Sequence, residues 1–246
     1  DSISITGDIA DLSVLSNIKR INYLELRNLP ELSSLENLSE LERVEVFNIV
    51  QCPKLFKLDE LVNLKSILEL RISSEEFQSL NGLGNLDTLE RLNIQKSSIG
   101  NLSGLENLAY LKYIGLDGNI NLEGGPKLDS IFGVGISNNN VVNDFSTIAN
   151  QLSSNIKVLI IVDMDSFRME GIELFENINK VDLIDVENLN LENTPFFEFT
   201  LEELYVLSCP NVRNLKGLED RKISTIILSW LSLFNDVSYL PNVCNR

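Results

Sequence analysis

The side chains that carry most enzyme chemistry are scarce in this sequence. It contains no histidine, which removes the commonest general base, the Ser-His and Cys-His nucleophile pairs, and every histidine-containing metal site. Its three cysteines, Cys52, Cys209 and Cys244, are too few and too widely spaced for a disulfide framework or a zinc knuckle. We therefore expect a protein that is not an enzyme, with no catalytic residues, no cofactor and no bound metal.

Two segments come closest to a ligand site. Asp163, Asp165 and Glu170 lie in VDMDSFRMEG, and alternate carboxylates can point at one cation, but the glycine and the later ligand of a calcium loop are missing. We interpret these acids as solvated loop charge. The stretch from Gly115 to Gly125 is glycine-rich but lacks the lysine of a phosphate loop, which indicates a loosened turn.

Composition limits the partners. With 246 residues and 43% hydrophobic content, the chain can bury a large core in one elongated domain or two compact ones. Its 36 acidic and 20 basic side chains give a net charge of −16, which should repel nucleic acid and anionic lipid. The longest wholly apolar run, residues 158–162, is far shorter than the ~20 residues that cross a bilayer. We expect no nucleic-acid partner and no membrane insertion.

The elements that would position any site come from a repeat with steps of 20 to 25 residues. Apolar residues recur at positions 1, 4 and 6 of each repeat. Positions 4 and 6 are two residues apart, as on one face of a strand, so positions 3, 5 and 7 face the other way. We predict one short parallel strand per repeat, beginning near position 2 or 3. Position 1 falls at Ile21, Val44, Ile67, Leu89, Leu111, Ile131, Ile156, Ile178, Leu201 and Ile223.

Leucines follow each predicted strand at every third residue, as at Leu32, Leu35 and Leu38. This spacing suits turns of 3₁₀ or α-helix that return along the outer side. No repeat can bury its leucines alone, so neighbouring repeats must stack on one core. We predict a single domain over residues 1–246 with about ten to eleven repeats, including a partial N-terminal unit at 1–20 and a C-terminal cap at 230–246.

This pattern resembles the leucine-rich repeat superfamily over nearly the whole chain. Position 9 in that family carries Asn or Cys, which satisfies backbone groups of the turns between repeats. The resemblance implies an α/β fold, a leucine-rich-repeat solenoid with one short parallel strand per repeat and turns or short helices on the convex side. It also implies that Cys52 and Cys209 are buried and inert. Position 9 is Cys52, Ser97, Asn119, Asn139 and Cys209, but it is Leu29, Glu75, Met164, Val186 and Leu231 in the other repeats.

The irregular position 9 is most similar to receptor L domains, the ligand-binding modules of insulin- and growth-factor-type receptors. That resemblance implies a recognition module that is secreted or displayed at a cell surface. The CPxL phrase, at Cys52 for example, is also similar to repeats of plant disease-resistance receptors. The alternative is therefore an intracellular regulatory or scaffold repeat domain cut from a larger receptor-like chain.

Positions 3, 5 and 7 should form the concave sheet face. In the first half of the chain they are largely polar, including Glu25, Arg71, Arg91 and Asp117, which suits polar recognition or plain solvation. From the seventh repeat they become apolar, and we expect them to be contiguous across neighbouring strands. Such an area usually marks an interaction site. We predict that it binds a protein partner, with a glycan ligand, self-association and cover by a loop as the alternatives. The predicted partner-binding residues are Val158, Ile160, Val162, Ile184, Tyr205, Leu207 and Ile227.

Overall fold

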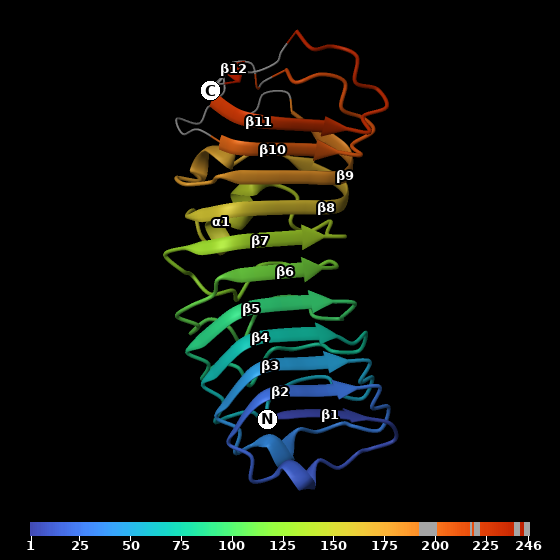
Figure 1. The fold of residues 1–246 in the computed structure, drawn as a ribbon, viewed down its shortest axis with the longest axis vertical. Helices are drawn as coiled ribbons and strands as arrows, with labels where there is room; N and C mark the ends of the chain where they lie inside the picture. Colours follow the sequence, from blue (N-terminus) through green and yellow to red (C-terminus); the bar gives the residue numbers. More distant parts are fainter. Residues whose placement is uncertain (192–200, 217, 219–221, 239–241, 244–246) are drawn as a thin grey trace. The chain divides into compact units, whose positions relative to one another are not determined.

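The computed structural model describes residues 1–191, 201–216, 218, 222–238 and 242–243 (Figure 1). These residues form a parallel β-solenoid of stacked coils, in which a coil contributes one strand to the sheet. The chain divides into two compact units, residues 1–128 and 129–246. We call them the first unit and the second unit. Part of the predicted C-terminal cap, including Cys244, lies outside the described residues.

The strands of the first unit pair in parallel with their sequence neighbours, as the repeat predicts. Their position-4 side chains stack in register, from Leu24 through Phe47 and Leu70 to Leu92. Most strands begin at position 1 or one residue before it, earlier than predicted, because the apolar residue at position 1 also joins the ladder. The strands are β1 (Ser2–Thr6), β2 (Arg20–Arg27), β3 (Arg43–Val50), β4 (Ser66–Ser73), β5 (Thr88–Gln95) and β6 (Tyr113–Asp117).

The second unit repeats this arrangement with two longer strands, and its neighbouring strands are again parallel. Behind the sheet lies α1 (Phe145–Gln151), whose N-cap Asp144 accepts a hydrogen bond from the backbone N–H of Thr147 at 2.8 Å. Phe145 packs edge-on against Phe167, with ring centroids 5.0 Å apart. The strands are β7 (Ile131–Ser137), β8 (Ile156–Arg168), β9 (Lys180–Asn190), β10 (Leu201–Leu207), β11 (Lys222–Ser229) and β12 (Asn242–Val243).

The core lies between the sheet and the returning segments. The strands contribute the buried side chains at positions 1, 4 and 6, and the return segments contribute the buried leucines that are spaced by three residues. The return segments are mostly turns, with three short 3₁₀-helices, and α1 is the one α-helix in the described part of the chain. Helix therefore contributes little to this solenoid. The 3₁₀-helices are η1 (Ser13–Leu15), η2 (Glu36–Leu38) and η3 (Ile172–Leu174).

Cys52 and Cys209 occupy equivalent buried positions beside the sheet. The Sγ of Cys52 donates to the carbonyl of Leu26 in the preceding coil at 3.5 Å, and the Sγ of Cys209 donates to that of Leu183 at 3.6 Å. Burial raises the pKa of both thiols, which keeps them protonated and unreactive. The prediction that these two cysteines satisfy backbone groups between coils is confirmed.

A left-handed residue at position 8 recurs along the solenoid, which the apolar pattern does not reveal: it directly follows the strand in seven repeats and lies within β8 and β9 at Asp163 and Asp185. Nine of the ten residues at position 8 have φ between 46° and 112°. Ser74 is the exception, and its Oγ instead accepts a hydrogen bond from the backbone N–H of Cys52 at 3.1 Å. The left-handed residues are Asn28, Gln51, Lys96, Gly118, Asn138, Asp163, Asp185, Ser208 and Trp230.

Candidate partner-binding face

The seven predicted partner-binding residues all lie in the second unit, on the side of the sheet that faces away from the core. None of them is buried, and Ile160 and Ile227 are 36% and 41% exposed. Strand β8 supplies Val158, Ile160 and Val162, and β9, β10 and β11 supply the others. We call the area that these seven residues define the second-unit face.

The apolar residues are contiguous along only one row across the strands. Val162 pairs in register with Ile184, and Ile184 pairs with Leu207, so these three side chains form an unbroken apolar row. A row closer to the strand starts is interrupted because Asp182 lies between Ile160 and Tyr205. The expectation of full contiguity is therefore wrong for that row, since β9 carries charged residues at positions 3 and 5.

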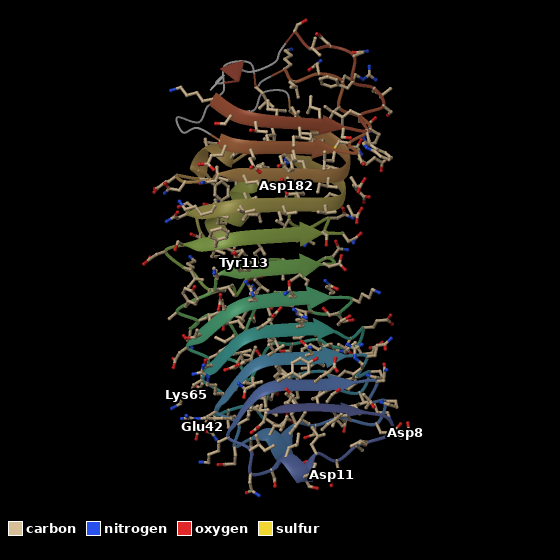
Figure 2. All side chains as sticks on the ribbon, viewed as in Figure 1. Asp8, Asp11, Glu42, Lys65, Tyr113 and Asp182 are labelled. Carbon is tan, nitrogen blue, oxygen red and sulfur yellow. The ribbon has the colours of Figure 1, made fainter. Side chains whose placement is uncertain are left out.

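The interruption is an ion-pair cluster that sequence reasoning missed. The Nζ of Lys180 lies 3.3 Å from Asp182 Oδ2 and 3.5 Å from Glu203 Oε2. The same ammonium lies 4.1 Å from the centroid of the Tyr205 ring, close enough for a cation–π contact. Figure 2 shows Asp182 on β9, within the sheet face. The missed signal was the pair of charged residues at positions 3 and 5 of the repeat that starts at Ile178.

Asp182 is the most enclosed charged group of this cluster. It is only 7% exposed, and its Oδ1 has no hydrogen-bond partner among the described residues. Burial raises the pKa of this carboxyl, and the neighbouring Lys180 only partly offsets the rise. For Lys180, burial lowers the pKa, but Asp182, Tyr205 and Glu203 together outweigh this and raise it overall. The second-unit face thus combines apolar side chains with a fixed, half-desolvated charge pair.

The corresponding face of the first unit has a different chemistry. Arg27 pairs with Glu25 at 2.8 Å, and Arg71 pairs with Glu69 at 2.6 Å, each within its own strand. The pKa of Glu25 is lowered, chiefly by the hydrogen bond from Arg27. Tyr113, marked in Figure 2, lies beneath the guanidinium of Arg91, with 5.1 Å between the Arg91 Cζ and the ring centroid. This polar face agrees with the polar residues predicted for it.

Comparison with known proteins assigns no family. No protein-family model matches the chain, and a search of curated proteins finds no match either. Within the described ranges, no group of three or more cysteine, aspartate or glutamate side chains is arranged to hold a metal ion. No helix in those ranges is long and apolar enough to span a membrane.

Proposed function

We propose that this chain is a non-enzymatic recognition module, built as a leucine-rich-repeat solenoid, that binds a protein partner through the second-unit face. One observation carries the proposal: seven apolar and aromatic side chains from four adjacent strands all lie on the solvent side of the sheet. Surfaces of this kind on soluble proteins usually mark interaction sites. The absence of histidine from the sequence supports the non-enzymatic reading.

The leucine-rich-repeat assignment rests on three features. The repeat length, the leucines buried on the return segments and the thiol-to-carbonyl bonds of Cys52 and Cys209 all fit that superfamily. The resemblance to receptor L domains further supports a secreted or cell-surface location as part of the proposal. Fractionation of the source cells with an antibody against the chain tests that location, and a cytosolic pool would favour the intracellular alternative.

The charge on the face favours a foreign protein over a second copy of this chain. The ion-pair cluster contains two carboxylates, Asp182 and Glu203, and one ammonium, Lys180. Two copies that each carry a net charge of −16 would repel one another on approach. The partner that fits best presents apolar side chains with at least one cationic group, which can lie against the carboxylates.

Substitution on the second-unit face tests the proposal. Ile160 and Ile227 are changed together to Thr, which keeps a β-branched side chain and removes apolar area. Aspartate at 160 is avoided because the register would place it beside Asp182. The matched control is Val62→Thr, an exposed valine of the first unit. All three proteins are immobilised, and the proteins that each retains from an extract of the source cells are compared by mass spectrometry.

We expect at least one protein retained by the wild-type chain and by Val62→Thr to be reduced at least tenfold by the double variant. That protein is then purified, and its affinity is measured with the same three chains. Equal retention by all three chains would refute the proposal. Light scattering of the wild-type chain and of the double variant measures self-association. If the wild-type chain is a dimer and the double variant is a monomer, the partner at this face is a second copy of the chain.

A further inference from the structure

One asparagine of the sequence is followed directly by glycine. The pair is Asn81 and Gly82, in the return segment between β4 and β5 (Figure 1). Every other asparagine precedes a residue that has a Cβ, in many cases leucine or isoleucine. The N–H of Leu83 donates to the carbonyl of Leu80 at 3.2 Å, so Asn81 and Gly82 are the two central residues of a β-turn. Asn81 is exposed in this turn.

The fold requires the glycine of this pair. Gly82 has φ of 100°, in the left-handed region that glycine adopts readily. A Cβ on Gly82 would lie 2.0 Å from the carbonyl oxygen of Leu58 and 2.8 Å from the backbone nitrogen of Asp59 in the preceding coil. Gly104 is enclosed in the same way, because a Cβ there would lie 2.5 Å from the carbonyl oxygen of Leu80. Close stacking of the coils therefore requires glycine at these turns, whichever residue precedes it.

The side chain of Asn81, in contrast, is not held by the fold. The backbone N–H of Asn81 donates to Ser79 Oγ at 3.1 Å, but within the described ranges neither its side-chain amide nor the Gly82 N–H makes a hydrogen bond. Asn85 differs, because its Nδ2 donates to the carbonyl of Val62 in the preceding coil at 2.9 Å. The Asn81 amide can therefore rotate towards the backbone nitrogen that follows it.

We propose that Asn81 is a site of spontaneous deamidation. The backbone nitrogen of Gly82 loses its proton and attacks Cγ of Asn81, and Nδ2 takes up a proton and leaves as ammonia. The new C–N bond closes a five-membered succinimide ring. A Cβ on the following residue would crowd the attacking nitrogen, and Gly82 has none.

Water then opens the succinimide at one of its two carbonyl groups. Breaking the bond between nitrogen and the side-chain carbonyl gives aspartate, and breaking the bond to the backbone carbonyl gives isoaspartate, in which the chain continues through Cγ. A molecule of water is consumed and a molecule of ammonia is released, and nothing is oxidised or reduced.

The turn itself controls the rate. A β-turn whose second central residue is left-handed, as Gly82 is, is of type II, with ψ of the first central residue near +120°. This ψ directs the Gly82 nitrogen away from the side chain of Asn81, so the turn must open before the ring can close. The folded chain should therefore react more slowly than the chain in urea.

The isoaspartate product would disturb the core beside the turn. It places the Cβ and Cγ of residue 81 in the main chain and so lengthens the path between Leu80 and Leu83. These two leucines are 0% and 1% exposed, and close-packed side chains tolerate little displacement. The aspartate product keeps the original backbone and adds a negative charge at an exposed position. Isoaspartate should therefore destabilise the chain, and aspartate should not.

Ageing of the full chain in mildly alkaline buffer at physiological temperature tests the proposal. Mass spectrometry of peptides follows the replacement of each asparagine amide by a carboxyl group, and chromatography separates isoaspartate from aspartate. Asn85 is the internal control, since it is also exposed but is followed by leucine. We expect Asn81 to convert at least tenfold faster than Asn85 in the folded chain. A rate for Asn81 no greater than that for Asn85 would overturn the proposal.

The neighbouring coil supplies a matched variant. Asn81→Ser gives this turn the Ser-Gly pair that the next coil has at Ser103 and Gly104, and it should abolish the release of ammonia from this turn. Equal release by Asn81→Ser and the wild type would overturn the proposal. In urea titrations the isoaspartate fraction of the aged chain should unfold at a lower urea concentration than fresh wild type, and Asn81→Asp should not. An isoaspartate fraction as stable as fresh wild type would overturn the predicted effect on the core.

Discussion

At the scale of single residues, two enclosed carboxylates of the second unit have opposite electrostatic environments. Burial raises the pKa of Asp182, and Lys180 does not fully compensate. Burial also acts to raise the pKa of Asp144, but hydrogen bonds from Thr147, Ser146 and Arg168 outweigh it and lower the pKa overall. Folding therefore favours the protonated form of Asp182 and the ionised form of Asp144.

The opposite pKa shifts of Asp182 and Asp144 predict opposite effects on stability when each carboxylate is replaced by a neutral amide. The folded pKa of Asp182 lies above its unfolded value, so the contribution of this carboxyl to stability falls as the pH rises through the interval between the two. Asp182→Asn should then increase the free energy of unfolding at pH 7. The folded pKa of Asp144 lies below its unfolded value, so its stabilisation is present at pH 7 and is lost as the pH falls through the folded pKa. Asp144→Asn should lower stability at pH 7.

Urea denaturation of the two variants and the wild type at pH 7 and about pH 3 measures both effects. The Asp182→Asn difference should shrink at the lower pH because the wild-type carboxyl is then protonated in both states. A loss of stability in Asp182→Asn at pH 7 would show that the ion pair with Lys180 outweighs the burial of the carboxylate, contrary to the prediction.

The two buried thiols give a second prediction at this scale. In a Cys244→Ser background, a thiol reagent should modify neither Cys52 nor Cys209 in native buffer and should modify both after denaturant is added. Replacing Cys52 by Leu should cost ~1–3 kcal/mol through overpacking. Reaction is followed by mass spectrometry, and rapid native labelling would contradict the ladder role of these residues.

At the scale of elements, the left-handed conformation at position 8 repeats more faithfully than the residue type at position 9. It directly follows the strand in most coils and lies within the strand in β8 and β9, and in most repeats it is not glycine. A left-handed conformation costs an ordinary residue roughly 1–2 kcal/mol, while glycine adopts it readily but loses more entropy on folding. Position 8 therefore holds backbone strain that packing against the neighbouring coils must offset.

Glycine substitution at two adjacent coils tests this account. Gln51 has φ of 52°, so Gln51→Gly should raise the free energy of unfolding by about 0.5 kcal/mol, the relief of strain less the added entropy cost. Ser74 occupies the same position with no such φ and bonds the Cys52 N–H. Ser74→Gly should lower the free energy of unfolding by about 1–2 kcal/mol. Denaturant titration measures both, and equal losses would show that the left-handed turn is not strained.

At the scale of the whole molecule, charge opposes folding. A net charge of −16 makes the compact chain repel itself, and salt screens that repulsion. The melting temperature should therefore rise when the ionic strength is raised from about 0.01 M to 0.15 M, as measured by circular dichroism at pH 7. A fall over this range would mean that the surface ion pairs contribute more to stability than the repulsion removes.

The solenoid could be predicted from the sequence because its cause is local and repeated. Every coil must bury the same apolar positions, so spacing alone specifies the strand face, the core and the direction of Ile160 or Tyr205 away from it. The parallel pairing follows because each coil stacks on the next. The burial of Cys52 and Cys209 also follows from their shared position in the repeat.

The chemistry of the two faces could not be predicted from the sequence and depends on the tertiary structure. Asp182 interrupts the apolar area, and Asn48 lies between Glu25 and Arg71, only because strands some 22 residues apart pair in a particular register. Hydrogen-bond partners depend on distances of about 3 Å that no periodicity specifies. The repeat determines which side chains leave the core, and contacts between coils decide what they can bind.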